Sequence, residues 1–452
     1  MNDKKVNDGV AISLLLAVVV ILATGIIGLG LAPIAPLLVA LTLIVLVMRL
    51  AGVPFKTSQA ALTKGIESGI TPLFLFLLIG SMIALWEGTG VIPTMIWVGF
   101  KLINPAWFLP TALLTSAVVG TMIGSAFTTL STVGVALMGI GTMIGLNPAL
   151  VAGMILSGAI FGDKSSPLSD STNLASAVSG TDLFDHLKNL MWTTMPAMLL
   201  TLVIALVVGL QHPVHSVAGT QIDHLLPLLH PTWWAIVPIA TMVLLALKKV
   251  PAIPSLMINI ALCSAAYLTQ HSLQSWAKIV VTGFKTTSHD ATLAALLNRG
   301  GMTAMMDTIM MIMLALSLGG LLSELGILRA VMAPIIKHLQ SQRSVVIAAL
   351  LTGISANFLV GEQYLATMLP GQVFKESFDR VGLSRLALGR AMEDSGAVMN
   401  YLVPWGVAGA FAAQTLHVSV LAFAPFTFLA LFSPVMSLLS ALTGIGLKQA
   451  KN

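Results

Sequence analysis

The chain is poor in cysteine and in charged residues. Cys263 is the single cysteine in 452 residues, which excludes an internal disulfide and any cysteine-based metal cluster. Only 9% of the residues are charged and 57% are hydrophobic, whereas soluble domains carry about 25% charged residues. A water-soluble fold could not bury so much apolar surface, so the composition predicts a polytopic membrane protein.

Signals of several other protein classes are also missing. The net charge of +5 comes without a basic cluster interleaved with aromatic residues, so we expect no nucleic-acid partner. Neither a Gly-x-Ser-x-Gly elbow nor a His-Glu-x-x-His zinc motif occurs. Ile160 stands where an intramembrane aspartyl protease would have glycine ahead of Gly162-Asp163. We therefore expect a protein that is not an enzyme and that needs no cofactor.

Long apolar runs predict membrane helices. The first run, Val10 to Leu31, is long enough to cross the hydrocarbon core, which takes about 20 residues, and too long for a signal peptide. Several later runs are shorter and are interrupted by Gly, Pro or Ser, a pattern typical of half-helices and re-entrant hairpins around a polar cavity. These runs predict an all-α polytopic fold with roughly 10–14 membrane segments, surrounded by the lipid bilayer.

The basic residues predict the orientation. When every apolar run is counted as a crossing from a cytoplasmic N-terminus, most of the 22 lysines and arginines face the cytoplasm. This distribution satisfies the positive-inside rule and places both termini in the cytoplasm. The loop that contains His212, His215, His224 and His230 then lies outside; a metal site there is one alternative, and a solvated loop is the other.

Short motifs recur in the same order in the two halves of the chain. The matches are Phe55-Lys56-Thr57 with Phe284-Lys285-Thr286, Gly145-Leu146 with Gly382-Leu383, Ser157-Gly158-Ala159 with Ser395-Gly396-Ala397, and Pro167 with Pro404. Basic residues surround the loop before Leu383 but not its counterpart around Asn147, which indicates that corresponding loops lie on opposite faces. Two inverted repeats with interrupted helices point to a secondary transporter.

The repeats divide the chain into four parts. We predict an N-terminal helical hairpin over residues 1–54 and a first repeat over residues 55–210, with scaffold helices, a hairpin and a broken helix. Residues 211–283 form an outer loop and a linking helical pair, and residues 284–452 form the second repeat.

The first polar segment follows an apolar helix directly. Gly162 and Pro167 interrupt a continuous helix, because proline lacks an N–H and clashes with the preceding turn. The unwound carbonyls and nearby hydroxyls suit a hard cation, whose charge a carboxylate would balance. The carboxylates are Asp163 and Asp170, and the hydroxyls are those of Ser165, Ser166, Ser169 and Thr172. The alternative is a cytoplasmic loop with capping serines.

The second polar segment contains adjacent acids inside an apolar stretch. Each carboxylate there costs about 2.5–3.5 kcal/mol on insertion scales, so the pair Glu393 and Asp394 calls for a function. Arg390 precedes the acids by one helical turn and could pair with either. A helix-stabilising salt bridge is the structural alternative. It would leave the second acid unexplained.

Two shorter polar patches occupy matching places in the repeats. Each could be the turn of a re-entrant hairpin that presents oxygens to an ion. One patch consists of Thr128, Thr129, Ser131 and Thr132, and the other contains Asn357 and Glu362. The alternatives are close helix packing by small residues and, for Glu362, a helix end in the membrane interface.

Together these segments resemble a known family. Gly162-Asp163-Lys164-x-Ser166-Pro167-Leu168-Ser169-Asp170-x-Thr172-Asn173, Gly361-Glu362-Gln363-Tyr364 and Glu393-Asp394-Ser395-Gly396 ahead of Pro404-Trp405 are similar to motifs of the NhaC-type Na⁺:H⁺ antiporters. That family, within the wider ion-transporter superfamily, usually has Asp where Glu362 stands. The stretch after Gly396 lacks the family's Thr/Ser-rich character. The family also includes malate–lactate exchangers.

The resemblance implies a secondary active antiporter of the bacterial cytoplasmic membrane that exchanges Na⁺ for H⁺ by alternating access. Its partners would be those two ions, Na⁺ at the ion site would be its only metal, and a homodimer is one possible assembly. The alternative is a proton- or Na⁺-coupled exchanger of small carboxylates such as malate and lactate, with Arg390 holding the anion.

The resemblance also assigns roles to residues. Asp163 and Asp394 would exchange protons for cations, because burial disfavours the charged form of a carboxylate until a cation arrives. Asp170, Glu393 and Glu362 would support them. The oxygen ligands would be Ser166, Ser169, Thr172, Asn173 and Ser395.

Overall fold

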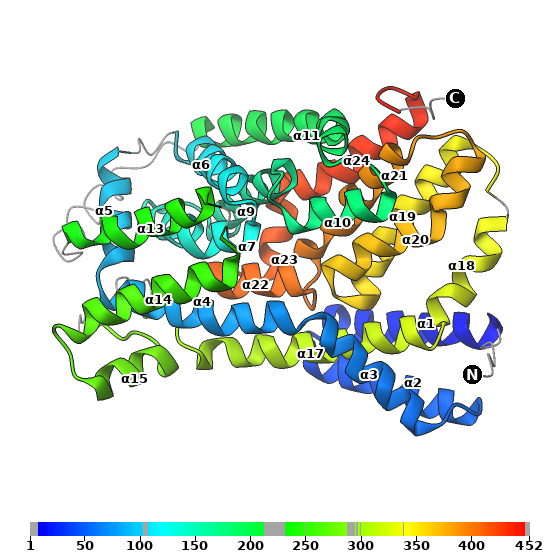
Figure 1. Cartoon of the computed structure of the whole chain (residues 1–452), viewed down its shortest axis with the longest axis horizontal. Coiled ribbons are helices and arrows are strands. Elements are labelled where there is room, and N and C mark those ends of the chain that lie inside the picture. The colour runs from blue at the N-terminus through cyan, green and yellow to red at the C-terminus, as the bar shows by residue number, and fades with distance from the viewer. Residues whose placement is uncertain are drawn as a thin grey trace.

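The structure is a computed structural model that describes residues 8–102, 107–211, 231–248, 250–286, 294, 297–298, 300–337 and 339–447. This part of the chain is built from helices and contains no strand (Figure 1). The loop histidines His212, His215, His224 and His230 lie outside the described residues, so the alternatives for that loop stay open.

The first half of the chain contains a continuous series of helices. They are α1 (Asp8–Leu22) with the π turn η1 (Ala23–Gly28), α2 (Ile34–Leu50), α3 (Phe55–Ser68), α4 (Ile70–Gly88), α5 (Val91–Leu102), α6 (Phe108–Ile123), α7 (Ala126–Thr129), η3 (Leu130–Gly134), α8 (Val135–Met143), α9 (Pro148–Ser165), α10 (Asp170–Ser179) and α11 (Leu183–Gln211).

Three linking helices and a second series follow. The linking helices are α13 (Ile236–Leu247) after the short turn η5 (Trp233–Ala235), α14 (Ala252–Leu268) and α15 (Leu273–Thr282). The second series consists of η6 (Thr303–Met305), α17 (Met306–Glu324), α18 (Ile327–Lys337), α19 (Gln342–Val360), α20 (Gln363–Arg380), α21 (Arg385–Met392), η7 (Glu393–Ala397), η8 (Met399–Leu402), α22 (Val407–Leu416), α23 (Val420–Phe423), η9 (Ala424–Phe426) and α24 (Phe428–Thr443).

Many of these helices are long and apolar enough to cross a membrane. Six qualify by length and composition in the described residues, or eight if each of two bent helix pairs counts as one span. This number is below the 10–14 segments predicted from the sequence, because it leaves out shorter apolar helices such as α2, α6 and α14. One bent pair, Arg385–Leu402 with Val407–Leu416, contains the break predicted ahead of Pro404, and the other lies between Val420 and Thr443, where the sequence predicts no break.

The order of elements in the first series recurs in the second. A hairpin turn at Gly124-Ser125 joins α6 to α7, and a turn at Gly361-Glu362 joins α19 to α20. Both glycines end their helix in the left-handed region, with φ of 72° and 71°, which a residue with a side chain rarely adopts. A broken helix and a long final helix follow each hairpin. The inverted orientation of the two units and the four-part division of the chain stay predictions.

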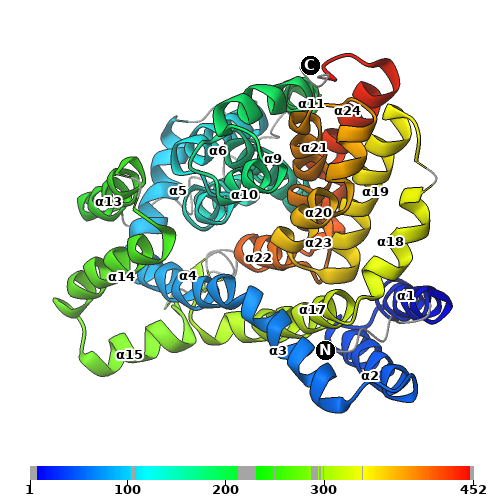
Figure 2. The ribbon, with the colours of Figure 1, turned by 45° about the vertical axis from the view of Figure 1, so that its right-hand side comes forward.

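The helices form two neighbouring groups with a row of helices along one side. Figure 2 shows α6, α9 and α10 beside α20, α21 and α24, while α3, α4, α14 and α17 run along the lower edge. Helices α6 and α9 approach closely because their facing residues are small. A methyl group added at Gly162 would lie 2.5 Å from the Cα of Gly120, so only glycine fits at that crossing. This tight contact holds the end of α9 in place.

Candidate functional site

The first broken helix runs from α9 to α10. The break spans residues 166–169 and contains Pro167, as the sequence predicts. Ser169 caps α10, and its hydroxyl accepts a hydrogen bond from the N–H of Thr172 at 3.3 Å. The amide of Asn173 donates to the carbonyls of Pro167 at 3.0 Å and Ser169 at 2.7 Å. Asn173 therefore satisfies backbone carbonyls that the break leaves without helical partners.

The second broken helix runs from α21 through η7 and η8 to α22, with a bend of 44° at the break. Asn357 of α19 holds this segment, because its amide donates to the carbonyls of Ser395 at 2.9 Å and Gly396 at 2.8 Å. Asn400 donates to the Asn357 side chain at 2.9 Å and accepts from the N–H of Ala408 at 2.8 Å. Both asparagines thus stabilise unwound backbone, and Asn357 has little capacity left for an ion.

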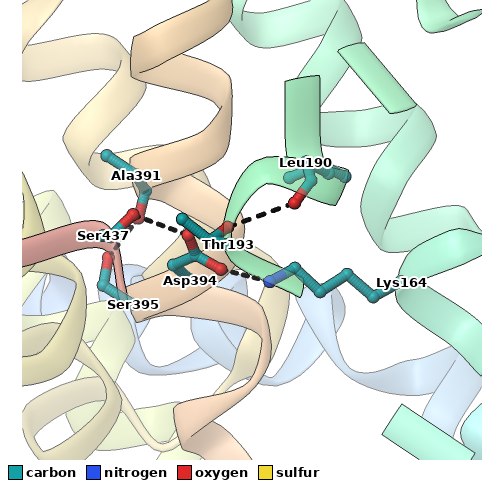
Figure 3. A network of polar contacts seen from close by, with 7 residues as sticks. All are labelled: Lys164, Leu190, Thr193, Ala391, Asp394, Ser395 and Ser437. Carbon is teal, nitrogen blue, oxygen red and sulfur yellow. Dashed lines mark hydrogen bonds and ion pairs between the residues drawn. The ribbon is translucent and has the colours of Figure 1, made fainter. Parts of the chain in front are cut away.

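A buried ion pair joins the two broken helices. Lys164, in the last turn of α9, contacts the carboxylate of Asp394 in η7, and the two side chains are only 2% and 0% exposed (Figure 3). The hydroxyl of Ser437 in α24 donates to the other carboxylate oxygen at 2.6 Å. A charge in such a place is tolerated only with a partner, since an unpaired buried charge is strongly destabilising. The pair therefore couples the two halves electrostatically.

Glu393, next to this pair, has no such partner. It is fully buried, and neither carboxylate oxygen makes a hydrogen bond within the part of the chain that the structure describes. It lies within electrostatic range of Lys164, Asp163 and Asp394. A buried carboxylate in this state requires a compensating proton or cation.

Arg390 has other partners than those expected from its position one turn before the acids. Its guanidinium donates to the carbonyl of Gly446 at 2.9 Å and to the hydroxyl of Ser440 in α24 at 2.7 Å. It lies within electrostatic range of Asp394 but makes no ion pair with it in the described residues. The neighbouring hydroxyl of Ser395 donates to the carbonyl of Ala391 at 2.6 Å, inside its own helix.

A cavity of about 560 Å³ reaches the other side of the first break. Its polar lining includes two carboxylates, those of Asp163 and Asp170, together with the side chains of Thr128 and Tyr364. Among the described residues that line it, none is Lys, Arg or His. The Ser169 hydroxyl interacts with the Asp163 carboxylate from the break itself. Because the charged side chains of this lining are both carboxylates, the cavity attracts cations.

The two hairpin turns contribute unequally. Thr128 lines the cavity, whereas the hydroxyls of Thr129, Ser131 and Thr132 donate to carbonyls one turn earlier in their own helix. Glu362 is buried at the second turn and caps α20, because its carboxylate accepts from the N–H of Leu365 at 2.6 Å. The hydroxyl of Ser166 also makes a local contact, because it accepts a hydrogen bond from the N–H of Leu168 at 3.2 Å within the first break.

Sequence reasoning missed several residues of the site. Ser437 lies in an apolar run, and Tyr364 and Tyr401 stand near Asp163 only in the folded chain. Lys164 belongs to the first polar motif, yet its buried ammonium group contacts an acid 230 residues away. No local pattern indicates contacts of that kind, because they depend on how distant helices pack.

A multispan helical protein in which two broken helices bring acids and a lysine together in its interior belongs to the class of secondary transporters. Comparison with known proteins gives the family. The model of the Na⁺/H⁺ antiporter family matches residues 9–172 and 158–445, and the chain belongs to this family.

Three relatives illustrate the similarity. The chain is 35% identical to the Na⁺/H⁺ antiporter NhaC of Alkalihalophilus pseudofirmus, over 98% of this chain and 97% of that protein. It is 34% identical to the Na⁺/H⁺ antiporter NhaC of Bacillus subtilis, over 97% of this chain and 98% of that protein. It is 32% identical to the malate-2H⁺/Na⁺-lactate antiporter of Bacillus subtilis, over 89% of this chain and 87% of that protein.

Proposed function

We propose that the protein is a secondary active antiporter that exchanges Na⁺ for H⁺ across the bacterial cytoplasmic membrane by alternating access, with both termini in the cytoplasm. The observation that carries the proposal is the buried carboxylate of Glu393, without a hydrogen-bond partner in the described residues, beside the Lys164–Asp394 pair. The relatives named as Na⁺/H⁺ antiporters over almost their whole length support it.

Lys164, Asp163, Glu393 and Asp394 form a cluster of charged groups. The net charge of this cluster explains why it would exchange the two ions. The cluster has more acidic side chains, Asp163, Glu393 and Asp394, than basic ones. This holds with Lys164 alone, and it still holds when the nearby guanidinium of Arg390 is counted. An excess of negative charge in a buried site is costly and is compensated by one more positive charge. Either a proton or a cation supplies that charge. The two ions therefore compete, which is the condition for antiport.

The cation would reach the cluster at Asp163. This carboxylate lines the cavity and is thus accessible from one side, whereas Glu393 and Asp394 are fully buried. The buried hydroxyl of Tyr401, which lies near it, has no hydrogen-bond partner among the residues that the structure describes, and neither has that of Thr172 in the first turn of α10. Hard cations such as Na⁺ prefer oxygen ligands of this kind. We propose Asp163, Glu393 and Thr172 as the central residues, with Asp170 at the entrance.

The charge of the cavity also favours a cation over a small carboxylate. Asp163 and Asp170 line it without a basic side chain among the described lining residues, so malate or lactate would meet repulsion. The guanidinium of Arg390, the expected anion ligand, is engaged by α24 and the turn that follows it. The charges of the site therefore favour Na⁺ as the exchanged ion, despite the similarity to a malate–lactate exchanger.

Purified protein in proteoliposomes tests the proposal. With a pH gradient across the vesicle membrane, addition of Na⁺ should dissipate the gradient, whether or not malate or lactate is present. Dissipation that requires malate or lactate would replace the proposed function with carboxylate exchange. No response to Na⁺ under any of these conditions would contradict the proposal.

A further inference from the structure

His186, near the start of α11, is a buried titratable residue without an assigned role. Its side chain is 0% exposed, and neither ring nitrogen has a hydrogen-bond partner in the described ranges. Leaving a buried polar group unpaired costs about 1–3 kcal/mol, so such a group calls for a reason. On the same helix, the amide of Asn189 donates to the carbonyl of Leu386 at 2.8 Å, while its own side-chain oxygen and the hydroxyl of Thr194 have no partner in the described ranges either.

The ion pair supplies the charges that act on the ring of His186. The charges within electrostatic range of it are those of Lys164 in α9 and Asp394 in η7. Helix α11 runs past the pair, as the positions of its Leu190 and Thr193 in the network show (Figure 3). On its own helix, Asp185 and Lys188 point outward, with side chains 60% and 77% exposed. His186 therefore stands between an exposed helical turn and the buried pair.

Hydroxyl groups continue from His186 toward the surface. A methyl group added at Gly389 would lie 2.7 Å from Cε1 of His186 and 3.1 Å from Oγ of Ser179, so the ring and this hydroxyl border the same glycine. The Ser179 hydroxyl is 3.0 Å from that of Thr181, in the turn between α10 and α11. The imidazole and this pair of hydroxyls therefore lie on the same side of Gly389, where the Ser179 hydroxyl also donates to the carbonyl of Ala175 at 2.7 Å.

This side of the cluster is separate from the cation cavity. The cavity reaches Asp163 and Asp170, but His186, Lys164 and Asp394 are absent from its described lining. The cavity and the His186 side therefore both adjoin the cluster, but His186 and its neighbours are not among the described residues that line the cavity. A small cation needs an open path with oxygen ligands, whereas a proton needs only a chain of groups that can accept and donate it.

We propose that His186 relays protons between the α10–α11 turn and the Lys164–Asp394 pair, so that protons and cations reach the cluster from different sides. This inference rests on the proposed function. One ring nitrogen takes a proton that water at the turn delivers through the Thr181 and Ser179 hydroxyls, and the other gives its proton through an intervening water molecule to the Asp394 carboxylate. Asp394 becomes neutral while Lys164 keeps its charge, so the cluster gains the positive charge that it loses when Na⁺ leaves. The ring then returns to its first tautomer.

Two transport modes separate a proton relay from a structural role. Na⁺/H⁺ exchange moves protons, whereas exchange of labelled Na⁺ for unlabelled Na⁺ does not. His186→Gln keeps most of the side-chain volume but cannot relay a proton. We expect it to slow Na⁺/H⁺ exchange by at least about tenfold, in line with the loss of a positioned acid–base group, and to leave Na⁺/Na⁺ exchange unchanged. The control is His271→Gln, since His271 is exposed and stacks on Tyr267 at 4.1 Å.

A second variant covers the case in which glutamine disturbs the fold. His186→Ala should lose Na⁺/H⁺ exchange and regain it when imidazole is added, without a change in Na⁺/Na⁺ exchange. Equal loss of both modes without rescue, or unchanged Na⁺/H⁺ exchange, would overturn the relay. Failure of the wild-type protein to exchange Na⁺ for H⁺ would instead contradict the proposed function.

Discussion

Removal of the buried lysine tests the electrostatic account of the site. In Lys164→Met, the carboxylate of Asp394 loses its ion-pair partner while it stays fully buried. The hydrogen bond from the Ser437 hydroxyl remains, but this neutral group does not compensate the negative charge of the carboxylate. Breaking a buried pair on one side costs about 3–5 kcal/mol, so the free energy of unfolding should fall by that amount. Equilibrium unfolding in mixed micelles at neutral pH measures the change.

A surface pair provides the matched control. Lys64 contacts Glu324 at 2.7 Å, with side chains 64% and 37% exposed, and exposed pairs of this kind contribute about 0–1 kcal/mol. Lys64→Met should therefore cost far less than Lys164→Met. Adding Asp394→Asn to Lys164→Met removes the unpaired charge and keeps an acceptor for Ser437, so it should restore part of the lost stability.

Acid pH gives an independent readout of the same variant. If protons from the solution replace the positive charge of Lys164, the cost of Lys164→Met should shrink as the pH falls. A cost no larger than that of Lys64→Met would refute the reasoning. The reasoning would also be refuted if Asp394→Asn lowered the free energy of unfolding by the same amount in the wild type and in Lys164→Met.

Two further predictions concern the backbone around the site. Asn357→Ala removes donors to the carbonyls of Ser395 and Gly396, and it should lower the free energy of unfolding by about 2–3 kcal/mol at roughly 1 kcal/mol per hydrogen bond; chemical unfolding would show no change if the break were held in another way. Gly162→Ala would place a methyl group 2.5 Å from the Cα of Gly120 and should cost about 1–3 kcal/mol by overpacking; unchanged stability would mean that α6 and α9 separate easily.

The membrane fold and its breaks could be predicted from local sequence. The apolar runs correspond to helices, and Pro167 and Pro404 lie in the two breaks, because proline lacks an N–H and clashes with the preceding turn. Proline alone does not decide, since α11 and α20 continue through Pro196 and Pro370. The acids of both segments were also predictable, since charges in apolar stretches need a function.

The pairing of charges could not be predicted in the same way. Local spacing favours a bond from Arg390 to the acids one turn later, but its long side chain reaches the carbonyl of Gly446 in the turn after α24 instead. Lys164 pairs with Asp394 because its long side chain reaches η7 from the end of α9, and His186 lies within electrostatic range of both on a third helix. Such contacts depend on tertiary packing, which no spacing rule encodes.

The central claim is that a carboxylate site open to the cavity exchanges Na⁺ for H⁺. The most direct measurement compares Na⁺-induced proton movement in proteoliposomes containing wild-type protein, Asp163→Asn and the surface control Glu324→Gln. We predict full activity for the wild type and the control, and none for Asp163→Asn at equal protein content. Undiminished Na⁺-dependent proton movement in Asp163→Asn would contradict the account.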